Sequence, residues 1–155
     1  MIKFQPSQLS LHGRAVKLLA RREHSRSELR QKLSVLGVLE EINPVLDRLE
    51  QTGLLSDARM AAAYVRGHAA RFGAVKLRQS LRSKGINDEL IEASLAQDGL
   101  EDEWQRARAL WRRKYGSQSG AALDRRETAR RARYLQSHGF PTDIIRKLLT
   151  TRDDE

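Results

Sequence analysis

The sequence LRQKLSVLG at residues 29–37 recurs as LRQSLRSKG at residues 77–85, and this repetition is the strongest indication of the fold. Each copy has leucines eight and four residues before its last glycine, which is the spacing of one apolar helix face. We predict that Gly37 and Gly85 each end a helix with positive φ, a conformation that penalises any side chain. Acidic residues and then apolar residues at helical spacing follow each glycine, so each copy predicts a helix, a glycine turn and a second helix.

A third, weaker copy surrounds Gly139, with Leu135 four residues before it and Arg131 in the place of the first leucine. Positive φ is predicted at this glycine too. The three glycines stand 48 and 54 residues apart, a period typical of stacked helical units. The sequence therefore predicts an all-α fold of about nine helices in three tandem three-helix repeats, helix-turn-helix-like and elongated or curved. The expected repeats cover residues 1–55, 56–100 and 101–155.

Capping residues predict where several helices begin. Ser25 or Ser27 starts the helix before the first glycine, and Glu28 stands at the capping-box distance from Ser25. Ser56 and the acidic residue after it open a helix expected to run to Gly73. Asn43-Pro44 is interpreted as an N-cap followed by proline at the first helical position, where the missing N–H costs nothing.

The charge of this 155-residue chain is strongly basic and unevenly placed. Lys and Arg number 29 against 20 Asp and Glu, for a net charge of +9, and 22 of the 29 are arginine. Residues 1–37 carry +6 and residues 104–133 carry +8, whereas residues 38–103 carry −4. Two separated positive segments favour a long polyanion as partner, and arginine favours bidentate recognition of phosphate or carboxylate.

Several classes of protein are excluded by residues that the sequence lacks. It has no cysteine, hence no disulfide, no cysteine-ligated zinc or iron–sulfur cluster and no catalytic thiol, which fits a reducing compartment. The four histidines are isolated from one another, and no phosphate-binding glycine motif occurs. No apolar run approaches the ~20 residues needed to cross a bilayer, and no signal-peptide pattern is present. We therefore expect a cytoplasmic protein that is no enzyme and has no cofactor, metal site or membrane contact.

Five motifs follow one another along the chain in a specific order. They are ARREHSRSEL at residues 20–29, VLDRLEQTGLLSDAR at residues 45–59, YVR at residues 64–66, LRSKGI at residues 81–86 and RYLQSHGF at residues 133–140. Single motifs of this length are weak, but the ordered set resembles the RecX family of recombinase regulators over most of the chain. The tandem three-helix architecture of that family agrees with the repeat read from the glycine spacing.

The resemblance implies a negative regulator that binds the RecA recombinase filament on single-stranded DNA. Such a protein inhibits ATP hydrolysis, strand exchange and repressor cleavage by RecA, by limiting filament growth or favouring disassembly. Capping and severing of the filament are both compatible with it, as are contact with RecA alone and direct contact with single-stranded DNA. The sequence departs from the family pattern at Asn43-Pro44, at Arg131 and in the Gly/Ser-rich insert at residues 116–120.

Basic side chains recur around the glycine-terminated helix of every repeat, where leucines fill the apolar stripe and leave the basic groups facing outward. The alternative is pairing along one helix, as between Glu28 and Lys32 at i,i+4, and we favour contact with the filament or DNA. Trp104 and Trp111 are expected in the core rather than stacked on bases. The candidate contact residues are Arg21, Arg22, Arg26, Arg30, Lys32, Arg66, Lys76, Arg78, Arg82, Lys84, Arg125, Arg126, Arg130, Arg131 and Arg133.

Two other functions suit a helical, basic chain. One is a helix-turn-helix DNA-binding transcription regulator, although such a protein usually presents one recognition helix per protomer and dimerises. The other is a plain single-strand binder, although stacking platforms need more aromatic residues than the 5 % present. A RecX-like regulator of the RecA filament, monomeric in solution, is the preferred interpretation.

Overall fold

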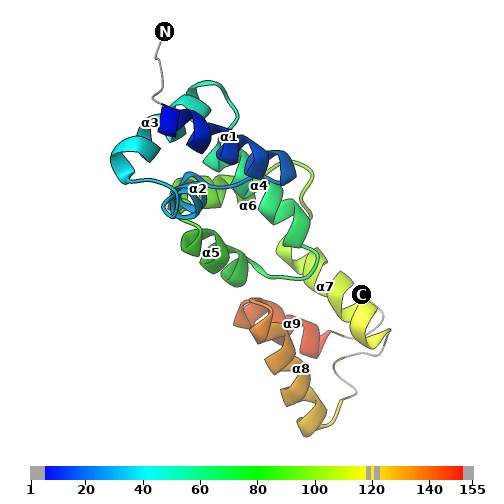
Figure 1. Cartoon of the computed structure of the whole chain (residues 1–155). Coiled ribbons are helices and arrows are strands. Elements are labelled where there is room, and N and C mark those ends of the chain that lie inside the picture. The colour runs from blue at the N-terminus through cyan, green and yellow to red at the C-terminus, as the bar shows by residue number, and fades with distance from the viewer. Residues whose placement is uncertain (1–5, 118–119, 121–122, 152–155) are drawn as a thin grey trace. The chain divides into compact units, whose positions relative to one another are not determined.

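The structure is a computed structural model that describes residues 6–117, 120 and 123–151. These residues form nine α-helices and no β-strand (Figure 1). The predicted all-α class and the three successive three-helix repeats, α1–α3, α4–α6 and α7–α9, are confirmed. The helices are α1 (Pro6–Arg21), α2 (Arg26–Leu33), α3 (Leu39–Gln51), α4 (Asp57–His68), α5 (Ala74–Ser83), α6 (Asp88–Leu95), α7 (Glu103–Tyr115), α8 (Arg125–Ser137) and α9 (Thr142–Thr150).

Capping side chains start the helices much as their sequence predicts. The hydroxyl of Ser25 accepts a hydrogen bond from the backbone N–H of Glu28 at 3.0 Å, and the Glu28 carboxylate accepts one from the Ser25 N–H at 3.3 Å. This reciprocal pair confirms the capping box. The side chains of Ser56 and Asn87 accept from the N–H three residues on, at 3.2 and 2.9 Å. However, α4 ends at His68, before the predicted Gly73.

The predicted helix start at Asn43-Pro44 is wrong. Helix α3 begins at Leu39, after Val38, whose carbonyl accepts from the N–H groups of Glu41 and Ile42 at 3.0 Å each. Pro44 therefore lies inside the helix, where its ring cannot donate a backbone hydrogen bond. Burial of an apolar face along α3 outweighs that loss. The buried residues of this face are Ile42, Val45, Leu46 and Leu49.

Positive φ is confirmed at two of the three repeat glycines. Gly85 has φ of +78° and Gly139 has φ of +85°, whereas Gly37 is outside the left-handed region. The prediction fails at Gly37 because α2 ends at Leu33 and a turn separates the two. Gly37 is confined for another reason, since a Cβ there would stand 3.2 Å from a methyl carbon of Leu11.

The two positive-φ glycines also pack closely against the first turn of an earlier helix. A Cβ on Gly85 would stand 2.4 Å from Cβ of Ser27 in α2, and one on Gly139 would stand 2.3 Å from Cβ of Lys76 in α5. No real Cβ comes so close. Glycine is therefore required at both positions twice over, for its backbone conformation and for its lack of a side chain.

The chain divides into two compact units that do not coincide with the repeats. Unit 1 contains the residues up to Ala63 together with Leu81–Ser94, and unit 2 contains Tyr64–Ser80 together with the residues from Leu95 onward. Each unit thus combines two stretches that are apart in the sequence. The sequence repeat therefore describes local structure only, whereas each compact unit also includes a segment from another part of the chain.

The core of unit 1 lies where α1, α2 and α3 meet. The leucine pair that defines the first repeat is entirely inside, since Leu29 and Leu33 are both 0 % exposed. The same spacing places both side chains on one face of α2, toward α1 and α3. The buried cluster consists of Leu11, Ala15, Leu29, Leu33, Ile42, Val45, Leu46, Leu49 and Leu55.

The core of unit 2 is formed by α7, α8 and α9. Trp111 is 6 % exposed, so its predicted place in the core is confirmed, while Trp104 is partly buried against the same cluster. Two backbone hydrogen bonds attach the start of α5 to this part of the unit, from Gly73 N–H to the His138 carbonyl at 2.7 Å and from Val75 N–H to that of Gly139 at 3.1 Å. The buried cluster consists of Ala107, Leu110, Trp111, Leu135, Phe140, Ile145 and Leu148.

Candidate partner-binding site

The candidate basic residues lie mostly where the repeat predicts, on α2, α5 and α8, the second helix of each three-helix repeat, or directly beside them. Arg66 lies on α4. The candidate residues differ in how far their side chains are exposed to solvent. Exposed are Arg21, Arg22, Arg30, Lys32, Arg66, Arg82, Arg125, Arg126, Arg130 and Arg133; half-buried are Arg26, Lys76, Arg78 and Lys84; Arg131 is buried.

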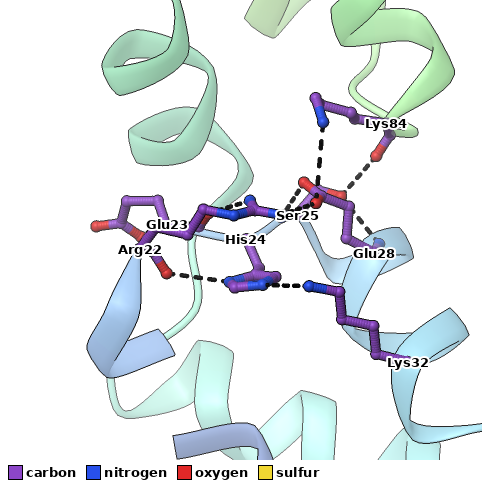
Figure 2. Close-up of polar contacts among 7 residues, drawn as sticks. All are labelled: Arg22, Glu23, His24, Ser25, Glu28, Lys32 and Lys84. Atoms are coloured by element: carbon purple, nitrogen blue, oxygen red, sulfur yellow. Dashed lines mark hydrogen bonds and ion pairs between the residues drawn. The ribbon is translucent and has the colours of Figure 1, made fainter. Parts of the chain in front are cut away.

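His24 is the buried centre of the opening motif, with only 2 % exposure (Figure 2). Its Nδ1 lies 3.0 Å from the Arg22 carbonyl oxygen and its Nε2 lies 2.9 Å from Nζ of Lys32. A lysine ammonium can only donate, so Nε2 accepts and Nδ1 carries the ring hydrogen. Burial lowers the pKa of His24, and the nearby charges of Arg22 and Lys32 lower it further. The histidine is therefore neutral, and it ties Lys32 of α2 to the end of α1.

Glu28 is the acidic centre of the same motif (Figure 2). Its carboxylate accepts from Arg22 at 2.8 Å and lies 4.0 Å from Nζ of Lys84. Burial raises the pKa of Glu28, but hydrogen bonds from Arg22 and the Ser25 N–H outweigh burial and lower it overall. The Ser25 hydroxyl donates to the Lys84 carbonyl at 2.5 Å. Together these contacts hold the turn between α5 and α6 against the start of α2.

Arg26 joins α2 to α3 and to the start of α4. Its guanidinium lies 2.8 Å from a carboxylate oxygen of Asp47 and 3.1 Å from one of Glu50. Its backbone N–H donates to Asp57 at 2.8 Å. Arg26 is therefore half-buried and engaged within the fold, because acidic residues 21 to 31 positions away in the sequence bind its guanidinium and its backbone N–H. Much of the opening motif thus holds unit 1 together.

Arg131 is buried, so the prediction that it faces outward is wrong. It occupies the repeat position of Leu29 and Leu77, which are both 0 % exposed, and it is itself 6 % exposed. Its guanidinium carbon lies 4.0 Å from the ring centroid of Tyr115, and its Nε donates to Glu127 at 2.9 Å. A ring face and a carboxylate make this burial of a cation tolerable. The repeat alignment contained the signal for its place in the core.

One group of basic residues was missed because it lies outside the repeated helix. Arg112, Arg113 and Lys114 form the exposed last turn of α7, where cations complement the helix dipole. Nζ of Lys114 lies 4.4 Å from the ring centroid of Tyr134 on α8. The concentration of positive charge in residues 104–133 was the sequence signal that could have identified this turn.

The candidates best suited to a partner are those left exposed. Arg126, Arg130 and Arg133 are spaced at i, i+4 and i+7 along α8, so they follow one side of that helix in unit 2; we call them the α8 arginine row. Arg21 and Arg30 lie at the end of α1 and on α2 in unit 1. Within the described part of the chain, Arg21, Arg30, Arg126 and Arg133 are exposed and form no ion pair.

Among residues 6–117, 120 and 123–151, no three or more His, Cys, Asp or Glu side chains are grouped so that they could hold a metal ion. None of the helices described combines the length and the apolar character needed to cross a membrane.

The arrangement places the chain among all-α proteins built of consecutive three-helix domains with basic second helices. Family models match it in the same order: the first three-helix domain of RecX matches residues 13–49, the second matches residues 56–95 and the third matches residues 101–149. The chain therefore belongs to the RecX family. The repeat boundaries predicted above, at 1–55, 56–100 and 101–155, stay predictions.

Relatives and solved structures agree with this assignment. The regulatory protein RecX of Leptothrix cholodnii is 47% identical over 150 residues, covering 96% of this chain and 92% of the relative. That of Halorhodospira halophila is 40% identical over 143 residues, covering 91% and 87%. A crystal structure of regulatory protein RecX superposes with a TM-score of 0.76 at 26% identity, covering 92% of this chain and 72% of that chain. The RecX structure from Lactobacillus salivarius has the same fold, with a TM-score of 0.73 at 23% identity over 92% and 94% of the two chains.

Proposed function

We propose that this protein is a non-enzymatic negative regulator of RecA in the cytoplasm. It binds the RecA filament on single-stranded DNA and inhibits its ATPase, strand-exchange and coprotease activities, by limiting filament growth or promoting disassembly. The observation that carries the proposal is the match of all three RecX domains, in order, in a chain whose relatives are named regulatory proteins.

The exposed arginines support the proposal at the level of chemistry. A filament on DNA presents phosphates, and guanidinium groups bind phosphate and carboxylate as planar forks. The α8 arginine row offers three such groups on one helix side, and Arg21 with Arg30 offers two in unit 1. We propose these two sets as the contact residues, in place of Arg26 and Arg131, which are engaged within the fold.

The experiment that tests the function is the single-strand-dependent ATP hydrolysis of RecA with this protein well below the RecA concentration. Control of the filament predicts progressive inhibition at low ratios, because one bound molecule affects many RecA subunits. Inhibition only when the protein matches the DNA binding sites would mean plain competition for DNA. No inhibition would overturn the proposal and favour a helix-turn-helix transcription regulator.

The contact residues are tested with charge-reversal variants matched in net charge. The double variant Arg21→Glu/Arg30→Glu is compared with Arg48→Glu/Arg146→Glu, which reverses two exposed arginines on α3 and α9 instead. We expect the first pair to weaken cosedimentation with RecA filaments at least tenfold and the second to change it less than threefold. Equal loss in both variants would mean that only net charge matters.

A further inference from the structure

The loop between α2 and α3, together with the first residue of α3, exposes an unusual run of apolar side chains. Val35 is 83 % exposed, Leu36 is 58 %, Val38 is 59 % and Leu39 is 53 %. Single exposed apolar residues are ordinary, but four in five consecutive positions form a patch of the kind that marks an interaction site. We call residues 35–39 the apolar loop.

The same unit also has an apolar groove. It has a volume of about 390 Å³ and lies beside the C-terminal half of α1 and the turn after α3. Leu54 in its wall is 47 % exposed, so the groove leaves a large apolar side chain in water. Glu23 and Arg59, which form an ion pair, stand at its polar side. Its lining residues are Val16, Leu19, Ala20, Glu23, Gly53, Leu54 and Arg59.

The loop cannot fill the groove of its own chain. Gly37 in the loop adjoins the side chain of Leu11 in the first half of α1. The groove involves Leu19, eight residues further along that helix, or about 12 Å at 1.5 Å per residue. A projecting apolar element and an apolar recess at different places on one unit are complementary between two copies, and such a head-to-tail contact can repeat from one copy to the next.

We propose that the apolar loop of one copy docks into the α1 groove of the next copy, so that molecules bound along a RecA filament join head to tail. The filament part of this inference rests on the function proposed above, while the contact itself does not. The loop puts aliphatic side chains such as Leu36 into a recess lined by Leu19 and Leu54. The partner is thus a second copy of this chain.

Area and charge both argue for a contact that forms between aligned neighbours. Four side chains supply much less than the ~800 Å² per partner of a stable complex, so free molecules associate weakly. Alignment on a polymer raises the effective concentration of the neighbouring copy, so that a weak contact is populated. The exposed Glu40 adjoins the loop, and Arg59, 45 % exposed and paired with Glu23 in its own chain, lies at the groove, so Glu40 would bring a second carboxylate to this guanidinium.

The absence of native cysteine allows a direct test by disulfide cross-linking. The double variant Leu36→Cys/Leu54→Cys carries one thiol in the loop and one in the groove, at exposed positions where substitution leaves the core intact. Head-to-tail contact predicts a ladder of dimers, trimers and longer chains on oxidation, with at least threefold more product when RecA filaments are present. The matched control replaces Leu36→Cys by Gln31→Cys, an exposed position on α2 outside the loop.

Each result of the cross-linking experiment either supports or overturns the head-to-tail contact. A mixture of the two single variants, Leu36→Cys and Leu54→Cys, should give mixed dimers, whereas each alone should not. Dimers of Leu36→Cys alone would show loop against loop and overturn the proposal, as would cross-links from the loop to a RecA carrying engineered cysteines. Absence of a ladder while the variant still cosediments with RecA filaments would overturn it and leave the regulatory function intact. Failure to bind the filament, with a ladder in free solution, would overturn only the function.

Discussion

His24 illustrates how a single buried side chain gives this fold a pH dependence. The ring accepts from Lys32 and is 2 % exposed, so a proton on Nε2 would remove a hydrogen bond and add a charge next to an ammonium group. Its pKa in the folded protein is below the usual 6.5, chiefly through burial. Between the two pKa values the unfolded chain binds more protons than the folded one. The stabilisation is therefore complete above pH 6.5 and is lost as the pH falls toward the folded pKa.

We predict that the free energy of unfolding declines as the pH falls below 6.5 and that His24→Gln flattens this decline. Glutamine keeps an acceptor for Lys32 without a titrating ring. Urea unfolding at several pH values, compared between His24→Gln and the unsubstituted protein, measures the effect. An unchanged slope in His24→Gln would contradict the assignment of this histidine.

Gly85 is a residue at which backbone and packing both exclude a side chain. With φ of +78° and only 2.4 Å between a Cβ and that of Ser27, Gly85→Val should destabilise the protein by about 2 kcal/mol or more. Gly13 in α1 is the matched control, since a Cβ there meets nothing within 4 Å. Gly13→Ala should stabilise by about 0.5–1 kcal/mol through helix propensity. Chemical denaturation compares the two, and equal midpoints would refute the turn assignment.

The start of helix α2 is held by ion pairs with residues of α3, which the sequence of α2 alone does not predict. Arg26 is 27% exposed and its acidic partners on α3 are 59% and 45% exposed, so solvent weakens both ion pairs. We expect Arg26→Ala to cost about 0.5–1 kcal/mol and Arg30→Ala, on the same helix, less than about 0.5 kcal/mol. Thermal unfolding followed by circular dichroism distinguishes them. A larger loss for Arg30→Ala would show that the exposed arginine, too, is structural.

Local sequence signals predict where the helices begin better than they predict the contacts between helices. Ser25, Ser56 and Asn87 act within three residues, so their capping roles are readable from sequence. The helix start predicted at Pro44 is wrong because proline prefers the first helical position, whereas burial of the α3 face, a property of the packed unit, outweighs that preference. The partners of Arg26 lie at least 21 residues away, so helical spacing alone could not tell a paired arginine from an exposed one.

At the scale of the whole molecule, the net charge of +9 predicts binding that weakens as salt is added. If the α8 arginine row contacts phosphates, reversing Arg126, Arg130 and Arg133 to Glu removes three such contacts. The slope of log affinity against log salt should then fall by about 2, at roughly 0.7 per phosphate on a single strand. Fluorescence anisotropy of filaments on labelled DNA at 50–200 mM salt measures this. Weaker binding with an unchanged slope would place the row on protein instead of DNA.

Unit 1 also has a consequence for how the chain is made. It takes in residues 81–94, and the Ser25 hydroxyl bonds to a carbonyl 59 positions later. A ribosome adds ~5–20 residues per second, so the first three helices wait roughly 2–9 seconds for the segment that completes them. During that interval the start of α2 lacks the turn that Gly85 fits against it. The nascent chain can therefore finish its first compact unit only after synthesis of its second repeat is nearly complete.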